Sequence, residues 1–144
     1  MKELTVDAKI DCLDAVMTFV GEAFEELGGS AKSVTRFVLA ADESFTNVAS
    51  YAYRDMASTG DPLFGKALLR AESLEREGIP VGMLTLVDAG RPYDPLARRD
   101  PDITLSAEER QPGGLGIFMT KKVMDRVQYC YENGRNVLIM YRRL

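Results

Sequence analysis

Apolar side chains recur at steps of three and four residues through most of residues 34–53, VTRFVLAADESFTNVASYAY. At about 100° per residue they form one stripe of a helix, which comprises Val34, Phe37, Val38, Ala41, Phe45, Val48 and Ala52. The same spacing places Glu43 and Asn47 one turn apart, on the side opposite this stripe. We therefore predict a long amphipathic helix with a carboxylate and a carboxamide as neighbours on its polar side.

Two further segments have helical spacing. Residues 8–27 carry a stripe made of Ile10, Leu13, Met17, Val20, Phe24 and Leu27. Asp7 suits its N-cap, Gly28 and Gly29 suit a left-handed C-cap, and Ser30 or Ser33 then starts the long helix. A third helix is predicted from Gly113 to about Val127, with Leu115, Met119, Val123 and Val127 facing inward.

Strand-like runs occupy residues 2–6, 64–73, 81–87, 127–131 and 136–141. Turn residues join them in pairs, with Gly78 and Pro80 in one connection and Asn133-Gly134 in another. Such neighbouring hairpins predict an α+β fold, a two-layer sandwich whose mixed, mostly antiparallel sheet carries the helices on one face. We see one domain over residues 1–144. Its segment 93–112 has three prolines and no periodicity, so we interpret this segment as a functional lid or a binding loop.

Composition narrows the classes of function. The chain has 144 residues, a net charge of −4 and no histidine, which excludes histidine-based triads and histidine metal sites. Its mild acidity does not favour direct nucleic-acid binding. The N-terminus has no apolar signal core and no run reaches the ~20 apolar residues of a membrane span, so we expect a cytoplasmic protein off the membrane.

Three short motifs carry candidate chemistry. The first is Glu43 with Asn47, the second is Asp88-x-Gly90 after a strand, and the third is the glycine run 113–116 at a helix start. A glycine-rich helix N-terminus offers free N–H groups to phosphate. The Asp88 carboxylate can accept a hydrogen bond from an exocyclic amine such as that of adenine. Asn47 provides a hard oxygen ligand of the kind that Mg²⁺ prefers, and the Glu43 carboxylate can take a proton from a hydroxyl.

Each motif has an ordinary alternative. Glu43 and Asn47 fit a solvated helix surface, Asp-x-Gly fits a plain turn, and the glycine run fits a loop or helix start. Two common nucleotide sites are disfavoured, because the chain lacks the Gly-x-x-x-x-Gly-Lys-Ser/Thr phosphate loop and a strand–Gly-x-Gly-x-x-Gly–helix unit.

In this order, the three motifs resemble those of the gyrase/histidine-kinase-type (GHKL) ATPase superfamily. The nearest likeness is to its small anti-sigma-factor serine kinases of the RsbW type. Residues 43–47 match the Glu-x-x-x-Asn box, residues 88–92 the Asp-x-Gly-x-Pro form of the first glycine box, and residues 110–117 the second glycine box. The resemblance covers the chain from about Lys9 to Leu144.

The resemblance implies a Bergerat-type ATP-binding fold that uses ATP and Mg²⁺. It implies Glu43 as general base, Asn47 as metal ligand and Asp88 as adenine anchor. The remaining nucleotide contacts that it implies are Gly90, Pro92, Arg110, Gly113, Gly114, Leu115, Gly116 and Ile117. One departure is Tyr51, which stands four residues after the Asn where the family often has histidine.

The resemblance further implies an ATP-dependent protein serine/threonine kinase. Such a kinase phosphorylates a small anti-anti-sigma protein and sequesters a sigma factor, and a homodimer is compatible with it. The alternative is an ATP-binding regulatory interaction module without kinase turnover. A hydrolase or a small-molecule kinase is less favoured, since the chain has no phosphoacceptor histidine.

Overall fold

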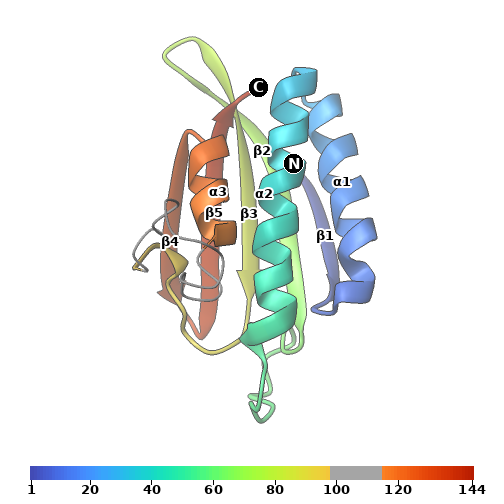
Figure 1. Ribbon diagram of the computed structural model, residues 1–144, viewed down its shortest axis with the longest axis vertical. Coiled ribbons are helices and arrows are strands. Elements are labelled where there is room, and N and C mark those ends of the chain that lie inside the picture. Colours follow the sequence, from blue (N-terminus) through green and yellow to red (C-terminus); the bar gives the residue numbers. More distant parts are fainter. Residues whose placement is uncertain (98–114) are drawn as a thin grey trace.

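A five-stranded sheet with helices on one face forms the frame of the protein (Figure 1). The structure is a computed structural model that describes residues 1–97 and 115–144. In spatial order the strands are β1 (Lys2–Asp7), β2 (Lys66–Arg76), β3 (Ile79–Asp88), β5 (Arg135–Arg143) and β4 (Arg126–Glu132). The covering helices are α1 (Leu13–Glu26), α2 (Ala31–Asn47) and α3 (Leu115–Val123). The predicted two-layer α+β fold is confirmed.

All pairings between the described strands are antiparallel, so the expected parallel component of a mixed sheet is not found among them. The reason is the position of β5. The chain leaves β3, crosses through α3 and enters β4, and the turn at Asn133 and Gly134 then returns β5 between them. Because β5 separates β3 from β4, two strands that run in the same direction never pair.

Four helix boundaries lie at other residues than the apolar stripes indicate. α2 begins at Ala31, before the stripe that starts at Val34, because Ser30, one of the two expected starting residues, is the N-cap and its Oγ accepts a hydrogen bond from the Ser33 N–H at 3.1 Å. It ends at Asn47, and one π-helical turn continues over Val48–Ala52. The first helix starts with a 3₁₀ turn at Ile10–Cys12. α3 ends at Val123, earlier than predicted, since β4 already begins at Arg126.

The core is closed by a pair of stacked phenylalanine rings. Phe24 of α1 and Phe37 of α2 are fully buried, with ring centroids 3.8 Å apart and planes 4° from parallel. Both rings lie on Gly82 of β3, where an added Cβ would come within 2.8 Å of Phe37 Cζ and 2.9 Å of Phe24 Cε1. A glycine in the sheet therefore lets both helices pack closely on it.

None of the helices within residues 1–97 and 115–144 has the length and apolar character of a membrane span.

Removing one of these rings is expected to destabilise the whole helix layer. For Phe37→Ala we expect a loss of about 3–5 kcal/mol in the free energy of unfolding, the range for deleting a buried aromatic side chain. Denaturant unfolding followed by circular dichroism measures the change. Ile10→Ala is the control, because Ile10 is 54% exposed and its truncation should cost less than about 0.5 kcal/mol. Equal losses for the two variants would contradict this description of the core.

Candidate functional site

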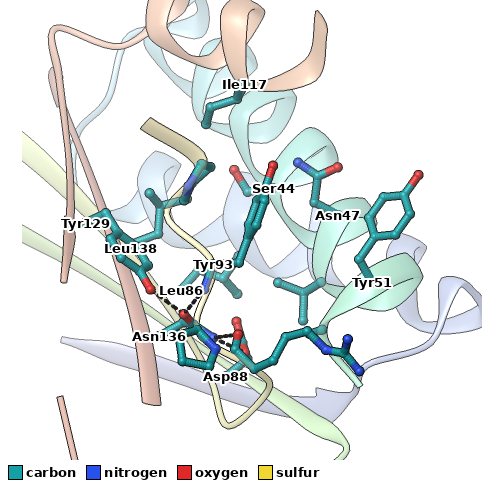
Figure 2. A pocket seen from close by; sticks show the side chains of 15 residues that line it. Ser44, Asn47, Tyr51, Leu86, Asp88, Tyr93, Ile117, Tyr129, Asn136 and Leu138 are labelled. Atoms are coloured by element: carbon teal, nitrogen blue, oxygen red, sulfur yellow. Dashed lines mark hydrogen bonds between the residues drawn. The ribbon is translucent and has the colours of Figure 1, made fainter. Parts of the chain in front are cut away.

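A cavity of about 440 Å³ opens between the C-terminal end of α2 and the sheet (Figure 2). This volume lies within the range of small-molecule sites in proteins. Most of the lining is apolar, with a few polar groups among it. The lining residues are Ser44, Asn47, Val48, Tyr51, Ala52, Leu86, Asp88, Arg91, Pro92, Tyr93, Pro95, Ile117, Tyr129, Asn136 and Leu138.

Asp88 provides the most deeply buried charge of this lining. It is the last residue of β3 and is 6% exposed. Its Oδ1 accepts hydrogen bonds from the Gly90 N–H at 2.8 Å and from Asn136 Nδ2 at 2.9 Å. Burial raises the pKa of Asp88, and these two hydrogen bonds oppose the rise. Within the described chain Oδ2 accepts no hydrogen bond, so one carboxylate oxygen is left for a ligand.

Asn136 holds this part of the site together, and the sequence analysis missed it. Its Nδ2 donates to Asp88 and also to the Arg91 carbonyl at 2.9 Å. Its Oδ1 accepts from the Tyr93 N–H at 3.0 Å and from the Tyr129 hydroxyl. A signal was present in the sequence, because a polar Asn136 shares the inward side of β5 with the apolar residues at positions 138 and 140.

The apolar stripe predicts Glu43 and Asn47 on the side of α2 opposite the buried face. In the structure they do not lie there. The buried face is wider than the apolar stripe, because Ser33, Ala40 and Ser44 are buried as well. The two predicted residues therefore lie at its flank. Asn47 lines the cavity, which corrects the reading of a purely solvated surface for this residue.

Glu43 packs against the first turn of α3. A Cβ added at Gly116 would lie 2.5 Å from Glu43 Oε2, the end of a flexible side chain, so a larger residue there would make this carboxylate turn away. Burial raises the pKa of Glu43, and the charge of Asp42 raises it further. Within residues 1–97 and 115–144 its carboxylate forms no hydrogen bond or ion pair. Glu43 does not itself line the cavity; it lies one helical turn from Asn47, which does.

The other predicted site residues fall into three groups. Pro92 and Ile117 line the cavity, whereas Gly90 contributes its backbone N–H to Asp88. Leu115 begins α3, and its side chain is not among those described. Outside the described residues lie Arg110, Gly113 and Gly114, together with most of the predicted lid.

Tyr51, the departure from the family pattern, belongs to the π-helical turn after α2. It is 54% exposed and lines the cavity. The Arg54 guanidinium lies 5.2 Å from the centroid of its ring, a cation–π contact. The tyrosine in place of histidine therefore keeps an aromatic ring beside the site.

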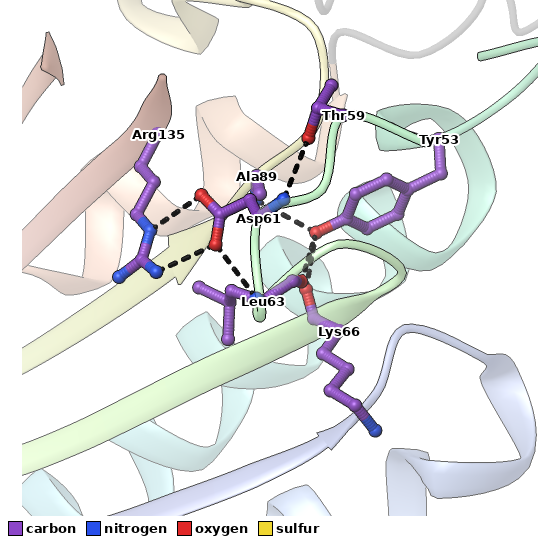
Figure 3. Close-up of polar contacts among 7 residues, drawn as sticks. All are labelled: Tyr53, Thr59, Asp61, Leu63, Lys66, Ala89 and Arg135. Carbon is purple, nitrogen blue, oxygen red and sulfur yellow. Dashed lines mark hydrogen bonds and ion pairs between the residues drawn. The ribbon is translucent and has the colours of Figure 1, made fainter. Parts of the chain in front are cut away.

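A polar network holds the backbone at Ala89, the residue that follows Asp88 (Figure 3). The Tyr53 hydroxyl accepts a hydrogen bond from the Ala89 N–H at 2.8 Å and donates one to the Lys66 carbonyl at 2.6 Å. Burial raises the pKa of Tyr53 to about 12, so the hydroxyl keeps its proton. Arg135 pairs with both oxygens of Asp61 at 2.8 and 3.0 Å and lowers the pKa of Asp61 to about 2.

The arrangement separates two kinds of chemistry. The Asp88 end offers a buried acceptor among apolar walls, which suits a flat ring that carries an amine. The α2 end offers a carboxamide beside a carboxylate of raised pKa, next to the beginning of α3. Such a pair suits proton transfer and the binding of a hard cation.

Comparison with known proteins agrees with this geometry. The sequence profile of the histidine kinase-like ATPase domain matches residues 6–142. The serine/threonine-protein kinase BtrW of Bordetella bronchiseptica is 29% identical over 111 residues, 77% of this chain and 71% of that protein. The serine-protein kinase RsbW of Bacillus mycoides is 22% identical over 138 residues, 95% of this chain and 81% of that protein.

A solved structure shares the fold. The crystal structure of the RsbU and RsbW domains of a Mycobacterium tuberculosis protein superposes with a TM-score of 0.63 at 17% identity, over all of this chain and 33% of that one. This chain thus spans about a third of that longer protein. The profile match covers nearly the whole chain, and the chain therefore belongs to the histidine kinase-like ATPase domain family, where it is similar to the RsbW-type serine kinases.

Proposed function

We propose that this protein is an ATP-binding anti-sigma factor and protein-serine kinase, which phosphorylates a small anti-anti-sigma protein and sequesters a sigma factor. The observation that carries the proposal is the free oxygen of a buried Asp88 in a cavity that Asn47 also lines. The printed names of the relatives BtrW and RsbW, both protein kinases, support the same reaction. A homodimer is part of the proposal by family likeness alone.

The Asp88 end binds the adenine in this proposal. Its free Oδ2 accepts a hydrogen bond from the exocyclic amine, while Oδ1 stays occupied by Gly90 and Asn136. Apolar side chains of the cavity, among them Val48 of the π-helical turn and Leu138 of β5, form walls around the ring. A base that presents a carbonyl oxygen at this position meets a carboxylate oxygen and is repelled.

The α2 end holds the phosphates and Mg²⁺. Asn47 supplies a hard oxygen ligand, and the N-terminal end of α3 faces the phosphates with its positive dipole end. In the described part of the chain no three acidic, cysteine or histidine side chains gather into a metal site, so the nucleotide and water supply the other ligands. Bound Mg²⁺ neutralises charge on the phosphate oxygens. Arg110, Gly113 and Gly114 complete the proposed phosphate site.

Glu43 is the general base of the proposed reaction. Its carboxylate takes the proton of the incoming serine hydroxyl as that oxygen bonds to the γ-phosphorus. The bond from this phosphorus to the oxygen that bridges it to the β-phosphate breaks, and ADP leaves with that oxygen. A raised pKa brings Glu43 closer to working pH, which favours proton acceptance.

The overall test combines purified protein, Mg-ATP and a small serine-bearing partner protein. Phosphate transfer to the partner supports the kinase. ATP binding and partner regulation without any transfer would instead favour a regulatory module that lacks turnover.

Glu43→Gln is expected to lower phosphate transfer by about 10²–10⁴-fold while ATP affinity stays unchanged, because the amide keeps the shape of the carboxylate and accepts no proton. Radiolabel transfer and calorimetry measure the two quantities. Glu22→Gln, the same change on the exposed face of α1, is the matched control. The wild-type rate should fall at low pH around a pKa above that of an ordinary glutamate, and Asp42→Asn should move this fall to lower pH. Unchanged transfer by Glu43→Gln contradicts the assigned role.

Asp88→Asn is expected to weaken ATP binding by roughly 10- to 100-fold, because an amide N–H replaces the free acceptor in a buried site. The loss for GTP should be smaller, since that N–H can donate to the guanine carbonyl. Calorimetry with ATP and GTP measures the change in the ratio of the two affinities. Asp14→Asn, at an exposed position of α1, is the control. Equal ATP affinity of Asp88→Asn and the wild type would remove Asp88 from base recognition.

A further inference from the structure

Tyr93 places an aromatic ring in the cavity, and nothing described so far gives it a role. Its ring stands in the middle of the pocket and points away from Asn136 (Figure 2). Although it lies among apolar side chains, the residue is 50% exposed. A large apolar ring left half-uncovered inside a ligand-sized cavity gains free energy when a flat ligand covers it.

The backbone of Tyr93 is held in one frame with Asp88. The Tyr93 N–H donates to Asn136 Oδ1 at 3.0 Å, and Nδ2 of the same carboxamide donates to Asp88 at 2.9 Å. Pro92 precedes Tyr93 and fixes its own φ, while Asp94 caps the following turn by accepting from the Leu96 N–H at 2.8 Å. The Tyr93 backbone and the Asp88 carboxylate therefore keep a set relation before any ligand arrives, which lowers the entropy cost of binding.

We propose that Tyr93 is the base-stacking residue of this site. Its ring covers one face of the adenine whose amine is bonded to Asp88, so that one residue recognises the edge of the base and the other its face. The inference rests on the proposed ATP site and adds a binding residue to it. Loss of one such stacking contact weakens binding by roughly fivefold to a hundredfold.

The other tyrosines that line the cavity fit this role less well. Tyr51 extends away from the pocket centre in Figure 2, and its ring already carries the Arg54 guanidinium at 5.2 Å. The Tyr129 hydroxyl donates to Asn136, which ties that side chain to the frame. In the described part of the lining, Tyr93 is thus the aromatic ring placed at the centre.

A tryptophan reporter tests the contact directly, because the chain contains no tryptophan. In Tyr93→Trp the indole should be quenched saturably by ADP and Mg-ATP and remain unquenched by inorganic tripolyphosphate, since a stacked adenine is required. Tyr131→Trp is the matched control, because Tyr131 is 45% exposed on β4 and does not line the cavity. Quenching of both reporters, or of neither while calorimetry shows that Tyr93→Trp binds ATP, overturns the proposal.

Affinities separate this inference from the function on which it rests. By calorimetry Tyr93→Ala should bind ATP fivefold to a hundredfold more weakly, whereas Tyr93→Phe, which keeps the ring, should match the wild type. Tripolyphosphate affinity should be equal in all three, and circular dichroism confirms that each is folded. Wild-type protein that binds no ATP overturns both proposals. ATP binding that is equal in Tyr93→Ala and the wild type overturns the stacking role alone.

Discussion

The site depends on a single side-chain contact, the hydrogen bond between Asn136 and Asp88. A carboxylate that is 6% exposed and forms no ion pair within residues 1–97 and 115–144 is costly unless donors surround it. Asn136 and the Gly90 N–H provide those donors. Because both act on one oxygen, they also decide which oxygen stays free. The same carboxamide binds the backbone on either side of Pro92, so the contact that makes the buried acid tolerable also shapes the wall next to it.

That contact is a product of the sheet topology. Asn136 is the register partner of Asp88 only because β5 lies between β3 and β4. A simple meander would put β4 beside β3 and leave Asp88 with a different neighbour. The Tyr53 hydroxyl and the Asp61–Arg135 pair hold the adjoining backbone from the other side. The buried acid is therefore braced from both of its sides.

Much of the fold follows from local patterns in the sequence. Periodicity locates the three helices, and turn residues such as Asn133-Gly134 pair β4 with β5. Neither signal says which strand lies beside β3, because that choice is made by long-range packing. The position of Asn47 at the flank of the buried face is not predicted for a related reason. Ser33 and Ser44 are polar and so do not count toward an apolar stripe, although both face the core. Asn136 is recognisable as a polar residue at an inward strand position, whereas the place of Tyr93 in the cavity depends on long-range packing that no local pattern records.

The distance between Asp88, the proposed base anchor, and Asn47, the proposed metal ligand, is set where the segment after β3 meets the end of α2. Gly90 presses against Ala52, and an added Cβ would lie 2.7 Å from the Ala52 Cβ and 2.8 Å from its carbonyl carbon. The Arg91 N–H donates to the Ala52 carbonyl at 3.1 Å, which seals this junction. Asp88 lies just before the junction, and Asn47 lies about one turn before it on the other segment. A side chain at Gly90 would force these segments apart, and the proposed base anchor would move relative to the proposed metal ligand. The glycine of the Asp-x-Gly motif is thus explained by the close approach of two backbones. In the proposed reaction, this approach keeps the base anchor and the metal ligand at a fixed spacing, and phosphoryl transfer depends on such alignment.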